Sequence, residues 1–300
     1  MASQRDVKQR VESVRNIQKI TSAMEMVAAA RLRRAELRIA ALRPYAGALR
    51  RMTRQAAEAA GNVPNFPILD ERKEVKTVGI LLVTGDRGLA GAFNSQIIRA
   101  GLRSATEHEE AGRKVRWYAT GRRGVSSLTF RGKELSGAFS GFTDRPAYGD
   151  ARTVAERLMA DFIDGKVDEV QIFYNGYVSA LAQVVRAETL LPLQRATVLE
   201  EGEAEEVEAE GQESRALVEY EPDPEIILQR LIPDYVEISI FRALLESTAS
   251  EHGARMTAMR NASENAADVI EELTLAMNRA RQAEITQEIM EVVAGSEALV

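Results

Sequence analysis

The fold of this chain is decided by residues Phe241 to Ala294, which read FRALLESTASEHGARMTAMRNASENAADVIEELTLAMNRARQAEITQEIMEVVA. The stretch has no proline and a single glycine, Gly253, and Ala, Glu, Met, Leu and Arg, which all favour helix, dominate it. Small and apolar residues recur at alternating spacings of three and four, a pattern typical of a coiled-coil seam. At 1.5 Å per residue the helix would be about 80 Å long, so we expect it to leave its own domain.

The seam of this helix is expected to be thin. Its positions are Leu245, Ala249, His252, Met256, Met259, Ser263, Ala266, Ile270, Leu273, Met277 and Ala280. Small knobs let a partner helix come close, but they bury about half of the area that a leucine seam buries. Beyond Ala280 a second stripe leaves this register at Ile285, Ile289, Val292 and Val293. The stripe is either an amphipathic end packed on its own protein or a tip that sits in an apolar socket of another protein.

A second long helix is predicted at the N-terminus. Residues 1–56 carry 13 Arg and Lys against four Asp and Glu, whereas residues 241–294 carry five Arg against nine Asp and Glu. The N-terminal seam is expected at Val7, Val11, Val14, Ile17, Ile20, Met24, Val27, Leu32, Ala35, Ile39, Leu42, Leu49 and Met52. Opposite charge and matched seams predict antiparallel pairing of the two helices. The charges set orientation, since exposed pairs contribute about 0–1 kcal/mol each. Pro44 predicts a kink or break near Arg43.

Between the helices the sequence changes to that of an α/β domain. Apolar runs at 78–84, 115–120, 167–174 and 184–193 predict four strands. A Gly-rich segment after the first strand opens a predicted helix, residues 121–124 form a predicted turn, and residues 150–164 are helical. Alternating strands and helices favour an open α/β sheet. The expected regions are an N-terminal coiled-coil helix at 1–60, the α/β domain at 75–195, an acidic loop at 196–219 and a C-terminal coiled-coil helix at 220–297.

The Gly-rich segment raises the question of nucleotide binding. Gly85, Gly88 and Gly91 are spaced GxxGxxG, whereas dinucleotide sites use GxGxxG and phosphate loops end in Gly-Lys-Ser/Thr. Asp86 would also place a carboxylate where a pyrophosphate should lie. The sequence therefore favours glycines that permit a tight strand–helix turn and close packing.

Composition bounds the remaining chemistry. The chain has no cysteine, which excludes disulfides and thiolate catalysis, and only two histidines, His108 and His252, too far apart to predict a metal site. No apolar run approaches the length of a membrane span, and the N-terminus does not read as a signal peptide. We expect a cytoplasmic protein with no cofactor, no metal and no catalytic site of its own.

Four segments resemble the gamma-subunit family of F-type ATP synthases. They are IQKITSAMEMVAAARLRRAE at 17–36, GDRGLAGAFN at 85–94, YEPDPEIILQRLIPDYVEISIFRALLES at 220–247 and SEHGARMTAMRNASENAADVIEELTLAMNRARQAEITQEIMEVVAG at 250–295. The last is the most specific, and the resemblance covers about three-quarters of the chain. The acidic run at 200–213, with eight acids and no base, departs from the family's pattern.

The resemblance implies a rotary central stalk that couples rotation of a c ring to conformational change at catalytic sites on the beta subunits. The implied partners are three alpha and three beta subunits, the epsilon subunit and the c-subunit ring, with no nucleic acid among them. The implied location is the cytoplasmic face of a bacterial plasma membrane, where the chain is held peripherally through the c ring.

The resemblance also assigns candidate residues. It implies contacts with beta subunits at Met24, Glu251, Arg255, Gln282 and Thr286. It places Tyr220 and Glu221 at a foot near the c ring and the epsilon subunit. The stripe at Ile285, Ile289, Val292 and Val293 becomes an apolar bearing inside a collar of alpha and beta subunits. Without the resemblance, each would be read as an ordinary seam or helix-surface residue.

Two other functions remain open on the residues alone. A coiled-coil nucleic-acid- or membrane-binding protein would use the basic N-terminal helix against phosphates. A nucleotide-dependent α/β enzyme would use the Gly-rich turn. DNA or anionic vesicles test the first, and binding of ATP or NAD tests the second.

Overall fold

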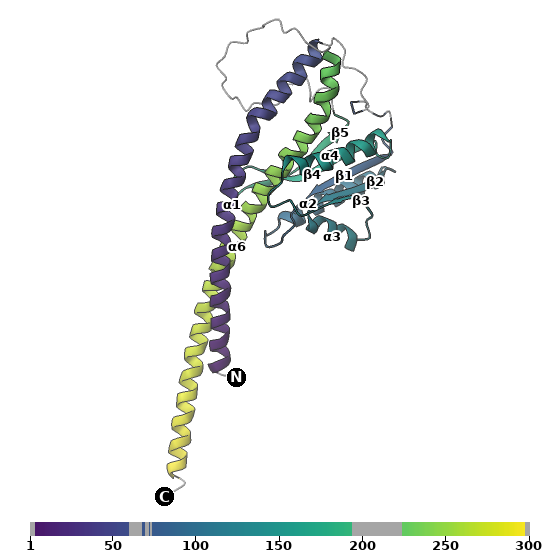
Figure 1. Ribbon diagram of the computed structural model, residues 1–300. Coiled ribbons are helices and arrows are strands. Elements are labelled where there is room, and N and C mark those ends of the chain that lie inside the picture. Colours follow the sequence, from purple (N-terminus) through teal and green to yellow (C-terminus); the bar gives the residue numbers. More distant parts are fainter. Residues whose placement is uncertain (1–3, 60–67, 70–71, 73, 194–223, 298–300) are drawn as a thin grey trace. The chain divides into compact units, whose positions relative to one another are not determined.

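The computed structural model describes residues 4–59, 68–69, 72, 74–193 and 224–297. The elements are α1 Gln4–Ala59, β1 Thr77–Val83, α2 Phe93–Glu110, β2 Lys114–Thr120, α3 Arg122–Phe130, β3 Leu135–Phe139, α4 Tyr148–Ile163, β4 Glu169–Tyr177, β5 Gln183–Leu191 and α6 Pro224–Glu297 (Figure 1). The predicted combination of an α/β sheet with two long terminal helices is confirmed. The predicted acidic loop at 196–219 lies outside the described residues.

The chain forms two compact units, and the division between them passes through both long helices. One unit contains the first part of α1, up to Ala30, and the last part of α6, from Arg255. The other runs from Arg31 to Ala254 and contains the sheet. The expected regions followed the ends of the helices, and their boundaries stay a prediction.

The sheet of the larger unit has the strand order β3-β2-β1-β4-β5. β1 pairs in parallel with β2 and β4, β2 pairs in parallel with β3, and β4 and β5 form an antiparallel hairpin. β1 is buried at every residue except its first, because helices cover both faces of the sheet at its centre. This double cover explains the continuous apolar run that predicted the strand.

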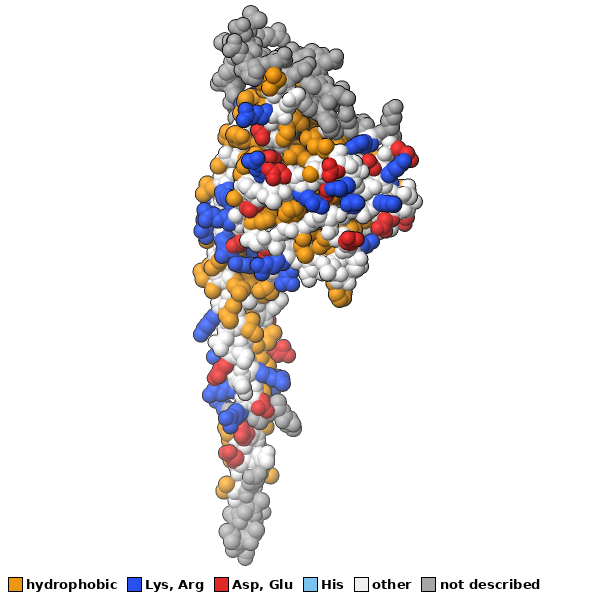
Figure 2. All heavy atoms as spheres, turned by 45° about the vertical axis from the view of Figure 1, so that its right-hand side comes forward, with side chains coloured by type: hydrophobic (Ala, Val, Ile, Leu, Met, Phe, Trp, Pro, Cys, Tyr) orange, Lys and Arg blue, Asp and Glu red, His pale blue; other side chains and the backbone are white. Residues whose placement is uncertain are grey.

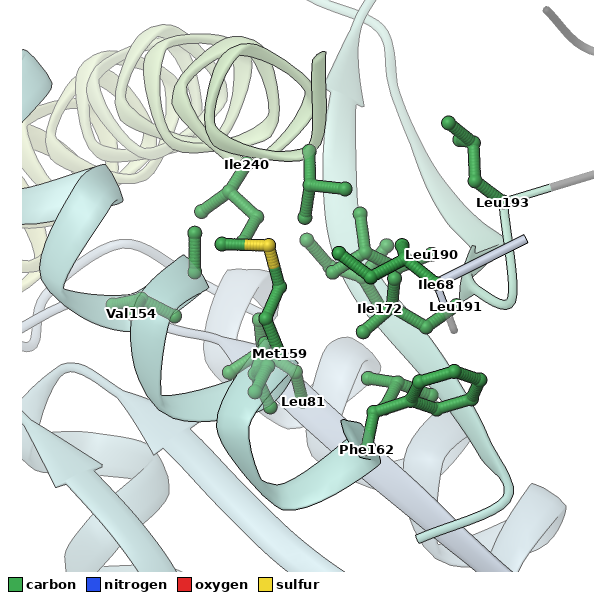
Figure 3. Close-up of a cluster of buried hydrophobic side chains, with 14 of the residues drawn as sticks. Ile68, Leu81, Val154, Met159, Phe162, Ile172, Leu190, Leu191, Leu193 and Ile240 are labelled. Carbon is green, nitrogen blue, oxygen red and sulfur yellow. The ribbon is translucent and has the colours of Figure 1, made fainter. Parts of the chain in front are cut away.

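Two apolar cores lie on opposite faces of the sheet. One face packs α4 and the first half of α6, with contributions from Val154, Met159, Phe162, Leu191 and Ile240 (Figure 3). The other face packs α2 and α3 against side chains such as Ile80 and Leu82 of β1. The sheet is therefore the middle of three layers, and α6 is part of one outer layer.

Two elements were missed in the sequence. The residues expected to form only a turn, 121–124, instead open helix α3, whose sequence RRGVSSLTF is poor in strong helix formers. The helix contains Gly124, where a Cβ would come within 2.7 Å of the Thr84 Oγ1. Close packing against Thr84 therefore favours glycine at this position, although glycine is a poor helix former. β3 is a short, half-exposed edge strand with a glycine at its centre, so it lacks the apolar run that marks a buried strand.

In the larger unit α1 and α6 pack together in opposite directions. Ala46 and Leu49 of α1 form a small core with Ile238 of α6. Ala56, further along α1, belongs to the core that contains Leu228, earlier on α6. α1 runs through Pro44 as one continuous helix, so of the expected kink or break the break is wrong, and the kink stays a prediction.

In the smaller unit the two helices are also antiparallel. The Thr21 and Ser263 hydroxyls are hydrogen-bonded at 2.6 Å, and Arg260 Nε donates to Glu25 Oε1 at 2.9 Å. Buried residues along this seam are Val7, Val11, Thr21, Ala28, Met259 and Ala266. The expected seam residues between Val14 and Val27 are wrong in register: Ile17, Ile20, Met24 and Val27 are 54, 55, 39 and 53% exposed. The buried seam instead follows a seven-residue repeat that includes Val7, Thr21 and Ala28. The four exposed residues form an apolar stripe beside this seam.

Candidate functional site

The larger unit has a position where α/β folds of this kind bind ligands. From β1 the chain extends the sheet through β2 to β3 on one side, and then crosses to β4 on the other. In open α/β sheets, ligands bind outside the carboxyl ends of the strands at such a switch point. The Gly-rich turn begins at Gly85, directly after β1, and therefore borders this crevice.

Side chains of α6 occupy the crevice. The Ser247 hydroxyl donates to the carbonyl of Val83, at the end of β1, at 3.4 Å. The Ser250 hydroxyl donates to the carbonyl of Asn175, in β4, at 3.0 Å. These two bonds place α6 across the ends of both strands that flank the switch point.

Glu251 explains the first glycine of the turn. Its side chain is buried, at 3% exposure, and a Cβ built on Gly85 would lie 2.7 Å from its Oε2. Real Cβ atoms essentially never come that close to another heavy atom, so a side chain at Gly85 would displace the carboxylate. Gly85 thus gives room to a side chain of this same chain.

Asp86 uses the backbone donors that an anionic ligand would otherwise meet. Its Oδ1 accepts from the Arg122 N–H, in the first turn of α3, at 3.0 Å. Its Oδ2 accepts from the Gly141 N–H at 2.9 Å, and from the N–H and hydroxyl of Thr143 at 3.2 and 3.0 Å. A helix N-terminus favours negative charge, and here a side-chain carboxylate supplies it. This supports the expectation that the Gly-rich segment is a structural turn.

Two further charged networks lie in the larger unit. Tyr118 and Lys166 donate to the Asp161 carboxylate at 2.8 and 3.2 Å, and Arg157 adds a bond at 3.0 Å. Burial opposes ionisation of Asp161, but the bonds from Tyr118 and Lys166 outweigh it and lower its pKa.

The second network joins β5 to α6. Arg242 donates to Glu188 at 2.8 Å, and Arg186 lies 3.6 Å from Glu246. Burial raises the pKa of Glu246, and the positive charges of Arg242 and Arg186 oppose the shift only in part. Both networks connect elements of the fold to each other.

Within the described ranges, no group of three or more His, Asp or Glu side chains could hold a metal ion. Among the helices that the structure describes, none is long and apolar enough to cross a membrane. Acidic and basic side chains are interspersed over the face of the α/β domain in Figure 2.

The predicted contact residues differ in burial. Met24 belongs to the exposed stripe on α1, and Arg255 is half-buried. Gln282 and Thr286 are exposed on α6, and the Thr286 hydroxyl donates to the Gln282 carbonyl at 2.8 Å. Glu251 differs from the other four because the chain itself covers it. The role of each residue in binding a partner stays a prediction.

The predicted tip and foot are described in part. Ile285, Ile289 and Val292 are 48, 57 and 73% exposed on α6. The side chain of Val293 lies outside the described residues, as do Tyr220 and Glu221. The seam positions of α6 as far as Ala280 are half-buried or buried, and every described side chain beyond it is exposed. The change of register seen in the sequence therefore coincides with a change in burial.

Sequence reasoning missed the stripe of Ile17, Ile20, Met24 and Val27. A signal was present, since the spacing after Val14 breaks the alternation of four and three. Taken together, the fold and the filled crevice define a class of protein: one with two long antiparallel terminal helices and an α/β domain that holds them.

Comparison with known proteins agrees with this class. The family described as ATP synthase matches residues 3–299. The ATP synthase gamma chain of Rubrobacter xylanophilus is 43% identical over 299 residues, which cover 100% of this chain and 99% of that protein. The ATP synthase gamma chain of Moorella thermoacetica is also 43% identical over 299 residues, with 100% of both chains covered.

Solved structures show the same fold. A chain of the central stalk and c-ring of the Tetrahymena thermophila mitochondrial ATP synthase matches with a TM-score of 0.60 and 26% identity, over 81% of this chain and 99% of that one. A chain of the Euglena gracilis mitochondrial ATP synthase, solved with OSCP, F1 and c-ring, matches with a TM-score of 0.69 and 19% identity, over 99% and 94%.

This chain belongs to the family of ATP synthase gamma chains. Its function is that of the central-stalk subunit of an F-type ATP synthase, and it is a subunit of that enzyme complex. The alternative of a coiled-coil nucleic-acid- or membrane-binding protein is not supported.

Proposed function

We propose that this chain is the rotating shaft that transmits work between a proton-driven c ring and the catalytic sites of three beta subunits. The observation that carries the proposal is the match to gamma chains over the full length of the helices and the α/β domain. The proposed partners are three alpha and three beta subunits, the epsilon subunit and the c ring. The chain would be held peripherally at the cytoplasmic face of a bacterial plasma membrane.

The energetics of such a machine require a stiff connection. One charge that crosses 100 mV yields about 2.3 kcal/mol, too little to make one ATP, so the work of several charges must be pooled. Two long helices that pair along a narrow seam can carry that work between distant sites. Small seam residues let the two helices lie close together along that seam.

We assign the chemistry to the beta subunits and give this chain no catalytic site of its own. Met24, Arg255, Gln282 and Thr286 are the proposed contacts with beta subunits. Glu251, covered by its own chain, is proposed to act indirectly by holding α6 at the crevice.

The two ends of the assembly have proposed contacts of their own. Tyr220 and Glu221 are proposed to meet the c ring and the epsilon subunit. Ile285, Ile289, Val292 and Val293 are proposed to turn inside an apolar collar of the alpha and beta subunits. Aliphatic side chains suit a bearing, since they give contact without directional bonds.

Reconstitution tests this proposal. The chain should co-purify with its own alpha, beta and epsilon subunits. Adding it to membranes that contain every other subunit should restore ATP synthesis. An equal amount of the chain without residues 255–300 is the matched control, because it keeps the whole larger unit, which ends at Ala254, and lacks the rest of α6. Failure to co-purify, or ATP synthesis that does not depend on the added chain, would contradict the proposal.

A further inference from the structure

We propose that Asp144 clamps both terminal helices to the α/β domain and thereby sets how completely rotation of the domain passes into the helices. This inference rests on the proposed rotary function. Asp144 lies in the loop between β3 and α4, in the larger unit. The helices it joins are α1 and α6, each of which continues beyond this unit.

The contact with α1 is an ion pair. Nη1 of Arg31 donates to both carboxylate oxygens of Asp144, at 2.5 Å each. The two side chains are 32 and 35% exposed, so the pair is about two-thirds removed from solvent. Hydrogen bonds between charged groups are stronger than neutral ones, and partial burial reduces their screening. Arg31 is the first residue of α1 that belongs to the larger unit.

The contact with α6 comes from the same carboxylate. Nε2 of His252 lies 3.8 Å from Oδ1 of Asp144, and the imidazole is 2% exposed. His252 stands two residues before Ala254, where α6 leaves the larger unit. One loop residue therefore contacts both helices at the positions where this unit ends.

The loop that carries Asp144 is fixed from two sides. Asp86 accepts from Gly141 and Thr143, as described above, and the Asp86 N–H donates to the Thr143 hydroxyl at 2.8 Å. From the other side, the Thr248 hydroxyl of α6 donates to the Thr143 carbonyl at 2.9 Å. The residue before Asp144 is thus bound to both the Gly-rich turn and α6, which holds the carboxylate in place.

Two neighbouring contacts hold α1 in the same region. The Tyr177 hydroxyl, at the end of β4, donates to Glu36 at 2.6 Å. Arg38 donates to the carbonyl of Pro146, two residues after Asp144. α6, by contrast, is held through the apolar core of the sheet. Leu32 and Ala35 of α1 are also buried in this region. Polar contacts around Asp144 are therefore one part of the attachment of α1 here, and their loss should loosen α1 while α6 stays packed.

The test uses the assembled ATP synthase in vesicles, where ATP hydrolysis and ATP-driven proton pumping are measured together. In the Asp144→Asn variant the amide leaves Arg31 without its ionic partner. We expect assembly and hydrolysis to persist while protons pumped per ATP fall about twofold or more. Loss of such a pair should shift the equilibrium between held and loosened α1 a few-fold, and turnovers with loosened α1 should pump fewer protons. The Arg31→Gln variant should lower the ratio in the same way.

Glu109→Gln is the matched control. Glu109 pairs with Lys133 at 3.2 Å and is comparably exposed, but both residues belong to the α/β domain alone. Its pumping ratio should equal that of the unmodified enzyme. The reversed pair, Arg31→Asp with Asp144→Arg, should recover much of the lost ratio.

Each outcome bears on the clamp. If Asp144→Asn and Arg31→Gln assemble and pump as well per ATP as the control, the clamp is wrong. If they lower only the yield of assembled enzyme and leave the ratio unchanged, the pair is merely structural and the clamp is again wrong. If the unmodified chain supports no pumping at all, the proposed rotary function fails, and that result is separate from any effect of the variants.

Discussion

At Gly85 the absence of a side chain leaves room for the carboxylate of Glu251 on α6. The carboxylate of Glu251 occupies the space that a Cβ would need. The sequence analysis predicted that this glycine permits close packing, and the contact with Glu251 agrees with that prediction. It could not reveal the packing partner, because Glu251 is 166 residues away in the chain.

The Gly85→Ala variant should therefore be destabilised by about 1 kcal/mol, the low end of the usual effect of inserting a methyl group into a packed site, because the atoms it meets are the far end of a flexible side chain. Denaturant unfolding of the isolated subunit measures this. In a chain that also carries Glu251→Ala, the Gly85→Ala substitution should lower the free energy of unfolding much less. Gly149→Ala is the control: a Cβ there meets nothing within 4 Å, so the free energy of unfolding should change little. An equal cost of Gly85→Ala with and without Glu251 would show that the two residues are not in contact.

Glu246 and Asp161 should respond to pH in opposite ways. The fold raises the pKa of Glu246, so the folded state holds its proton more tightly than the unfolded state. Its contribution to stability then falls as pH rises above its ordinary value of 4.5. The fold lowers the pKa of Asp161, whose contribution is present above its ordinary value of 3.8 and is lost as pH falls.

Unfolding free energies measured across pH should show both signs. Relative to Glu246→Gln, the unmodified chain should lose stability as pH rises above 4.5. Relative to Asp161→Asn, it should gain stability as pH rises, and at neutral pH the asparagine should cost about 2 kcal/mol, as expected for loss of a charged hydrogen bond. Parallel pH profiles for the two variants would contradict these assignments.

At the scale of the elements, the most predictable parts were those with strong periodicity or continuous burial. The long helices and β1 followed from such patterns. The register of α1 was wrong near Ile17, because aliphatic residues there lie beside the seam and polar Thr21 lies within it. α3 and β3 were missed because their sequences carry weak local preferences, and contacts with the rest of the sheet decide their structure.

The exposed polar residues near the end of α6 should matter for function and little for stability. Gln282→Ala or Thr286→Ala should lower ATP synthesis in the reconstituted enzyme, while the melting temperature of the isolated subunit stays the same. Thr286 bonds only within its own helix turn among the contacts described, so its loss should cost the fold little. Asn265→Ala, also exposed on α6, is the control that should leave both quantities unchanged. A fall in melting temperature that matches the loss of synthesis would assign these residues to the fold.

The apolar end of α6 should matter for assembly. Each buried aliphatic side chain contributes about 1.5–3 kcal/mol, so a collar around Ile285, Ile289 and Val292 would be worth several kcal/mol. Deletion of residues 285–300 should leave the α/β domain folded, weaken assembly or torque, and spare some rotation. Circular dichroism and the yield of assembled complex measure these effects. Unchanged assembly and unchanged turnover would remove the bearing from the account.

At the scale of the whole molecule, the position of the candidate site could be predicted only in outline. Strand order places a crevice at the switch point, but local sequence does not show that α6 fills it. That requires Ser247, Ser250 and Glu251 to meet strands encoded far earlier in the chain. The clamp at Asp144 has the same character, since Arg31, Asp144 and His252 are spread over 222 positions of the sequence.

The most direct test of the account is to watch the chain turn. A fluorescent rod would be attached to the α/β domain through a cysteine introduced at exposed Glu110, in a chain that otherwise has none. The alpha and beta subunits would be fixed to a surface and supplied with ATP. The account predicts rotation in one direction, driven by ATP and arrested when ATP is withdrawn. ATP hydrolysis by the same complexes while the rod stays still would contradict it.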